Sequence, residues 1–175
     1  QSTVMSLLRD WYATPPTWDT TVALDRLIAA QNAWLVAQNR RRQGAGTADR
    51  GEGTGQAAMC TLTALVLRAH GYTLAHVGDS RLYMVRAGQI HQLSEDHSYT
   101  SEMVKRGKMT REQARTSPYA NVITRAVGIQ KNVQVDTLMF DMIPGDTFLL
   151  CSDGLSGVVS EHDLTRLLAE GDPTY

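Results

Sequence analysis

The fold of this chain is decided by a stretch that reads YTLAHVGDSRLYMVRAGQIHQL, from Tyr72 to Leu93. Apolar residues recur in it at a spacing close to two, which is typical of short β-strands. Two turns interrupt the pattern, the first at residues 78–80 and the second around Gly88, which can adopt a positive φ. The stretch therefore predicts three strands, with Asp79 at the end of the first.

A second stretch repeats this arrangement. Residues 146–157 read DTFLLCSDGLSG, so that a buried strand expected over Thr147–Cys151 runs directly into Asp153 and a glycine. An Asp in such a place often does no more than cap a turn. Two strand-end carboxylates that a sheet brings together would instead form a hard oxygen site, which suits Mg²⁺ or Mn²⁺.

The composition is that of an ordinary globular domain. The chain has 175 residues, of which 42% are hydrophobic, and a net charge of −1, so we expect a single domain. Nothing in this charge balance indicates nucleic-acid or membrane-surface binding. No apolar run approaches the roughly 20 residues of a membrane helix. Cys60 and Cys151 lie in apolar runs, which favours free thiols in a reducing cytoplasm and leaves a disulfide open.

Helical patterns surround the predicted strands. Apolar residues three and four apart predict long helices over residues 2–12 and 20–40, with Trp34 packed in the core. Shorter helical patterns cover residues 98–106 and 110–115, and a last helix starts at Ser160. Strands in the middle, with helices before, between and after them, predict an α+β fold with mostly antiparallel sheet.

Four motifs in a fixed order give the chain a resemblance to a known family. They are HVGDSR (76–81), EDHS (95–98), NVITRAVG (121–128) and CSDGL (151–155). Their order and spacing resemble the metal-dependent Ser/Thr protein phosphatases, the PPM or type 2C family, in their bacterial form, over roughly residues 57–168. This resemblance implies two mostly antiparallel β-sheets sandwiched between helical layers (αββα).

The resemblance also implies a metal site. It assigns Asp153 to one ion of a core pair of Mn²⁺ or Mg²⁺, Asp79 to an additional and weaker ion, and Asn121 to a place near that extra ion. In this family the nucleophile is metal-bound water, so no Ser or Cys nucleophile is assigned. The implied substrates are phosphoserine and phosphothreonine in phosphorylated proteins, and the implied partner is a Ser/Thr kinase.

The expected layout is one partial phosphatase-like domain. Its parts are a helical layer (1–42), a flexible loop (43–56), a β meander (57–97), flap-like helices (98–125), and strands with a final helix (126–175). The Asp-Gly motif that the family carries near its N-terminus and the Asp-Asn motif near its C-terminus have no match here. We therefore expect a fragment that is incomplete at both ends and inactive by itself.

Two alternatives to an enzyme stay open at this point. The first is a non-catalytic, phosphatase-like binding or regulatory module that keeps the fold without the metals. The second is an unrelated α+β regulatory domain with turn aspartates, which the motif order disfavours. His97 likewise allows a general-base role or a turn-stabilising hydrogen bond, and we favour the hydrogen bond.

Overall fold

The computed structural model describes residues 2–45, 57–69 and 71–170. Along the chain its elements are α1 (Ser2–Ala13), α2 (Thr20–Ala45), β1 (Leu62–Arg68), β2 (Gly71–Val77), β3 (Arg81–Arg86), β4 (Gln89–Gln92), α3 (Tyr99–Lys105), α4 (Arg111–Arg115), β5 (Asp136–Asp141), β6 (Thr147–Cys151), α5 (Asp153–Ser156) and α6 (Glu161–Glu170).

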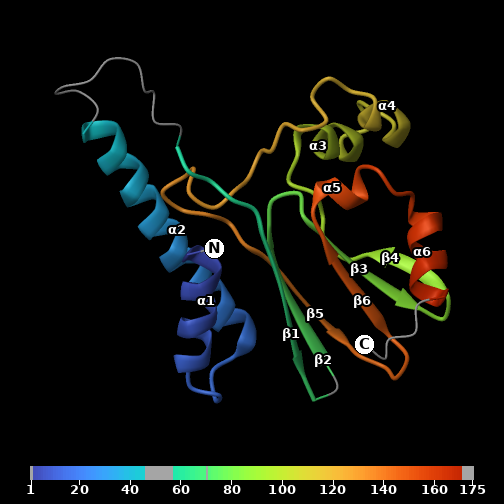
Figure 1. Cartoon of the computed structure of the whole chain (residues 1–175), viewed down its shortest axis with the longest axis horizontal. Helices are drawn as coiled ribbons and strands as arrows, with labels where there is room; N and C mark the ends of the chain where they lie inside the picture. Colours follow the sequence, from blue (N-terminus) through green and yellow to red (C-terminus); the bar gives the residue numbers. More distant parts are fainter. Residues whose placement is uncertain (1, 46–56, 70, 171–175) are drawn as a thin grey trace.

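Two three-stranded antiparallel sheets form the centre of the molecule (Figure 1). The first has the strand order β1-β2-β5, and the second has the order β4-β3-β6. Helices α1 and α2 lie on the outer side of the first sheet, and α6 lies against β4 of the second (Figure 1). The expected α+β fold, with two antiparallel sheets and helices outside them, is therefore confirmed.

The chain crosses from one sheet to the other at residues 78–80. β2 pairs with β1 and β5, whereas β3 pairs with β4 and β6. The three strands lie where the sequence predicted them, but the expectation of one continuous β meander over residues 57–97 is wrong. The two sheets pack through Tyr72, whose ring lies 4.8 Å from that of Phe148 and whose hydroxyl lies 3.5 Å from the sulfur of Met84.

Helix α2 buries one stripe of side chains against the first sheet. The buried stripe is spaced by three and four residues and comprises Leu24, Ile28, Asn32, Leu35 and Asn39. Trp34 lies beside this stripe and is 48% exposed, so its expected place in the core is wrong.

Two buried asparagines of α2 hold the segments that lead to the candidate site. The side chain of Asn39 accepts a hydrogen bond from the amide of Ala58 (2.8 Å) and donates to its carbonyl (2.7 Å). Asn32 accepts from the amide of Gly128 (2.8 Å). A Cβ on Gly128 would lie 2.5 Å from the side chain of Leu35, so only glycine lets this loop approach the helix so closely.

Other expectations need smaller corrections. Helix α2 continues to Ala45, so residues 43–45 are helical and the rest of the predicted loop, 46–56, lies outside the described residues. Strand β6 is only half-buried, and Leu150 is 46% exposed, because β6 is an edge strand of its sheet. Within the part of the chain that the structure describes, no helix has the length and apolarity needed to cross a membrane.

Candidate metal site

Two aspartates from different sheets line the same cavity. Asp79 follows β2 of the first sheet, and Asp153 follows β6 of the second. The cavity has a volume of about 270 Å³ and is lined by Met59, Cys60, Thr61, Asp79, Ser80, Ile123, Ala126, Ser152 and Asp153. The structure thus brings the two carboxylates together, as the sequence predicted, while their role as metal ligands stays a prediction.

The turn that carries Asp79 needs glycine at position 78. Gly78 has a φ of +118°, and a Cβ there would lie 2.4 Å from the side chain of Thr61. Thr61 also shares a hydrogen bond of 2.9 Å with the hydroxyl of Ser80, and Thr63 donates to the carbonyl of Ser80 (3.1 Å). The turn is therefore held against the segment that enters β1, and Asp79 is presented from a fixed backbone.

The cavity is electrostatically suited to a cation. Burial raises the pKa of the Asp79 carboxyl above its usual value, and the nearby charge of Asp153 raises this pKa further. Two like charges that destabilise one another would both be relieved by a positive ion between them. Asp153, the first residue of α5, lines the cavity and is exposed to solvent, so its carboxylate is accessible to such an ion.

The donor atoms fit a hard divalent cation in part. Carboxylate oxygens are the ligands that Mg²⁺ and Mn²⁺ prefer, and water can complete the coordination shell. Among residues 2–45, 57–69 and 71–170, however, no group of three or more His, Cys, Asp or Glu side chains is arranged to hold a metal ion. Asn121 is exposed and does not line the cavity, so the structure does not bring it to the two aspartates.

An ion pair supports the other side of the Asp79 turn, and sequence reasoning missed it. Arg81 donates to both carboxylate oxygens of Asp96 at 2.6 to 3.1 Å, and to the hydroxyl of Tyr83 (2.9 Å). Bidentate pairs of this kind fix geometry as well as contributing energy. Both charged residues lie within the quoted motifs, but no sequence pattern indicates that they meet.

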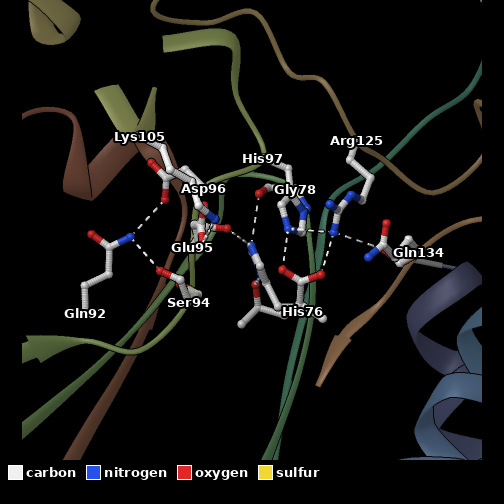
Figure 2. Close-up of polar contacts among 12 residues, drawn as sticks. His76, Gly78, Gln92, Ser94, Glu95, Asp96, His97, Lys105, Arg125 and Gln134 are labelled. Carbon is white, nitrogen blue, oxygen red and sulfur yellow. Dashed lines mark hydrogen bonds and ion pairs between the residues drawn. The ribbon is translucent and has the colours of Figure 1, made fainter. Parts of the chain in front are cut away.

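His97 makes the turn-stabilising hydrogen bond that the sequence favoured. Its Nδ1 accepts from the amide of Gly78 (2.9 Å), so its Nε2 carries the proton and donates to Asp136 (2.9 Å). Figure 2 shows the ring of His97 between Gly78 and Arg125. His97 is buried and does not line the cavity, and both of its ring nitrogens are engaged in hydrogen bonds within the protein, which argues against a general-base role.

Neither cysteine thiol is activated as a nucleophile. Burial raises the pKa of the Cys60 thiol, which keeps this lining residue protonated and weakly nucleophilic. Burial likewise raises the pKa of the Cys151 thiol. Both cysteines are free, in agreement with the expectation of unpaired thiols.

Comparisons with known proteins agree with this architecture. A sequence profile described as protein phosphatase 2C matches residues 2–172. The chain is 38% identical over 108 residues to the serine/threonine phosphatase stp of Listeria monocytogenes, covering 62% of this chain and 43% of that protein. It therefore spans less than half the length of this relative.

Solved structures show the same fold. The serine/threonine phosphatase Stp1 from Staphylococcus aureus superposes with a TM-score of 0.82 at 26% identity, covering 99% of this chain and 65% of that one. The catalytic domain of the phosphatase PstP, solved in complex with two manganese ions, superposes with a TM-score of 0.76 at 29% identity, covering 97% and 66%. With a family profile that matches nearly its whole length, the chain belongs to the protein phosphatase 2C family.

Proposed function

We propose that this chain forms the Asp79 and Asp153 part of a metal-dependent protein Ser/Thr phosphatase, which hydrolyses phosphoserine and phosphothreonine monoesters in proteins. One observation carries the proposal: in a member of the protein phosphatase 2C family, two strand-end carboxylates from separate sheets share a single cavity. The related phosphatase PstP has been solved with two manganese ions, which supports a similar metal requirement here.

Each carboxylate has a distinct role in this proposal. Asp153 would hold one ion of a core pair of Mn²⁺ or Mg²⁺, and Asp79 would hold an additional, weaker ion, whereas Asn121 does not line the cavity and is given no ligand role in this proposal. When bound, two such cations supply activation of a water molecule and neutralisation of the phosphoryl oxygens. The protein side chains orient and hold, and none of them attacks the phosphorus.

The backbone around the cavity determines how well the carboxylates are oriented. Gly78, Thr61 and the pair Arg81–Asp96 fix the Asp79 turn from three sides. A fixed turn favours metal binding by Asp79, because a hard dication such as Mg²⁺ tolerates little displacement of its ligands. Phosphorylated proteins are the proposed substrates, and a cytoplasmic Ser/Thr kinase that phosphorylates them is the proposed partner.

A non-catalytic phosphatase-like module is the second candidate. One observation favours it: the described residues provide two carboxylates at the cavity, and no group of three or more metal-ligating side chains. Such a module would bind phosphorylated proteins or a regulatory partner without hydrolysing them.

Hydrolysis of a phosphothreonine peptide by the full-length gene product distinguishes the two candidates. The peptide is incubated with the protein and Mn²⁺, with Mg²⁺, or with excess chelator, and released phosphate is measured; a matched phosphotyrosine peptide is the control. We expect metal-dependent release from the phosphothreonine peptide and little from the control. Absence of release at every metal concentration would contradict the enzyme and favour the binding module.

A further inference from the structure

We propose that His97 is a positioning residue that couples the flap-like segment, residues 98–124, to the turn that carries Asp79. One ring nitrogen contacts the turn, and the other contacts the carboxylate that holds the far end of the segment. This inference rests on the proposed function, because it concerns how the proposed metal ligand Asp79 is kept in place.

The first contact of His97 lies directly before Asp79. The amide of His97 donates to the carbonyl of Gly78 (2.7 Å), and the amide of Gly78 donates back to Nδ1 of the imidazole (2.9 Å). Both polar groups of Gly78 are thus bound by a single residue. Because Gly78 has a φ of +118°, these two bonds hold a backbone conformation that the next residue, Asp79, depends on.

The second contact of His97 reaches the end of the flap-like segment. Its Nε2 donates to one oxygen of Asp136 (2.9 Å), and Arg125 donates to the other oxygen (2.6 Å). The neighbouring amide of Thr124 donates to the carbonyl of His97 (2.8 Å). The hydrogen bonds to His97 and Arg125 outweigh the effect of burial and hold the pKa of Asp136 below its usual value, so the carboxylate stays charged at neutral pH.

The two ends of the segment meet beside these contacts. Ser98 and Ile123 form an isolated antiparallel bridge, and the amide of Tyr99 donates to the carbonyl of Val122 (2.9 Å). Ile123 also lines the cavity with Asp79 and Asp153. A movement at the base of the segment therefore shifts a wall of the cavity, and His97 transmits the same movement to the Asp79 turn.

Besides these contacts, an exposed ion pair between Lys105 and Glu95 (2.8 Å) joins α3 to the chain before it, and few side chains of α3 and α4 are fully buried. In α3 only Thr100 is buried, and α4 has no buried residue. His76 lies beneath His97, with ring centroids 4.9 Å apart, and donates from Nε2 toward the carbonyls of Gly78 and Glu95. The contact between the two rings, which Figure 2 shows, restricts rotation of the His97 imidazole.

A double-mutant cycle tests the coupling. Arg125→Met releases the far end of the segment without touching Gly78. His97→Asn keeps an oxygen near the place of Nδ1, so it can still accept from the Gly78 amide, but it is too short to reach Asp136. The primary measurement is the amide hydrogen-exchange rate of Gly78 by NMR, which requires no activity. The secondary measurement is the Mn²⁺ concentration that gives half-maximal hydrolysis.

We expect Arg125→Met to raise the exchange rate of Gly78 by at least about fivefold in the wild-type background and to have almost no further effect in the His97→Asn background. Arg125→Met should also raise the Mn²⁺ concentration that gives half-maximal hydrolysis, while kcat at saturating Mn²⁺ should change less. Arg125→Lys, which retains a charge for Asp136, should restore most of the protection. Arg115→Met, which removes an exposed charge from α4 in the same segment, is the matched control and should change neither measurement.

The coupling would be overturned if Arg125→Met left Gly78 exchange unchanged, or raised it equally in both backgrounds. Global unfolding is accounted for by measuring the stability of each variant in urea. If the wild-type protein releases no phosphate, the proposed function is wrong, yet the exchange cycle still decides whether His97 links the segment to the turn.

Discussion

At the scale of single residues, Gly78 determines whether Asp79 can face the cavity. Replacement by alanine would place a Cβ 2.4 Å from Thr61 and require a non-glycine residue at a φ of +118°. Because both effects oppose the native turn, we expect Gly78→Ala to lower the free energy of unfolding by about 1–3 kcal/mol. Urea denaturation monitored by circular dichroism measures this change.

A second glycine provides the control for that experiment. Gly88 also has a positive φ, +74°, but a Cβ there would meet no atom within 4 Å. Gly88→Ala should therefore cost less than Gly78→Ala, since only the backbone strain remains. Equal losses for the two variants would show that the contact with Thr61 does not restrict the turn.

The ion pair between Arg86 and Asp146 gives the protein a defined dependence on acid. Hydrogen bonds from the Arg86 guanidinium (2.7 Å each) hold the pKa of Asp146 below its ordinary value of 3.8. As the pH falls, the unfolded chain therefore takes up this proton first. The stabilisation is complete above pH 3.8 and is lost as the pH falls through the lower, folded-state pKa.

Unfolding in urea at pH 7 and at pH 3 tests this dependence. The difference in free energy of unfolding between the wild type and Asp146→Asn should shrink at pH 3. Asp25→Asn, which changes an exposed carboxylate of α2, should give a small difference at both values. A difference for Asp146→Asn that stays constant with pH would contradict the assignment.

Residue-level prediction from the sequence succeeded where the signal was local. Asp79 and Asp153 each follow a strand and precede or follow a glycine, and this pattern can be read directly. The pair Arg81–Asp96 could not be found in this way, because its partners are 15 residues apart and meet only after the chain has turned back twice. Trp34 was misplaced because its neighbours, not its own chemistry, decide which face of α2 is buried.

At the scale of elements, residues 98–124 should be the most mobile described part of the fold. Their two short helices bury little, and hydrogen bonds at the base of the segment hold its ends. Amides of α3 and α4 should exchange with solvent faster than those of β2 and β3, since local opening needs few buried contacts to break. Hydrogen exchange followed by mass spectrometry measures this, and uniformly strong protection across the segment would contradict it.

The strands were predictable from the sequence, but their pairing was not. A spacing of two marks a strand whether the next strand pairs with it or joins another sheet. The turn at residues 78–80 carries no residue pattern that separates a hairpin from a crossing between sheets. The crossing follows from packing: β2 lies against α2, whereas β3 lies between β4 and β6.

At the scale of the whole molecule, the two sheets matter because each delivers one carboxylate. The layered α+β architecture was predictable from the order of helical and strand patterns together with the motif resemblance. The metal-site roles of Asp79, Asp153 and Asn121 remain predictions, since the described residues place only the two aspartates at the cavity.

The polypeptide of residues 1–175 should show little turnover by itself, even with excess Mn²⁺. A clamp of two metal ions needs more ligands than the two carboxylates at this cavity, and the described residues supply no group of three or more. Release of phosphate from a phosphothreonine peptide measures this turnover. Robust Mn²⁺-dependent release would show that the site is more complete than the two carboxylates indicate.

The most direct test of the central claim is a Mn²⁺ titration of phosphothreonine-peptide hydrolysis by three variants of the full-length gene product. Asp153→Asn should reduce kcat by more than about 100-fold, beyond the range typical of groups that only support metal ligands. Asp79→Asn should do less harm and mainly raise the Mn²⁺ needed for half-maximal rate. Asp141→Asn, at a strand end outside the cavity, should behave like the wild type. If Asp153→Asn retains the activity of Asp141→Asn at every Mn²⁺ concentration, the two-carboxylate cavity is not the metal site.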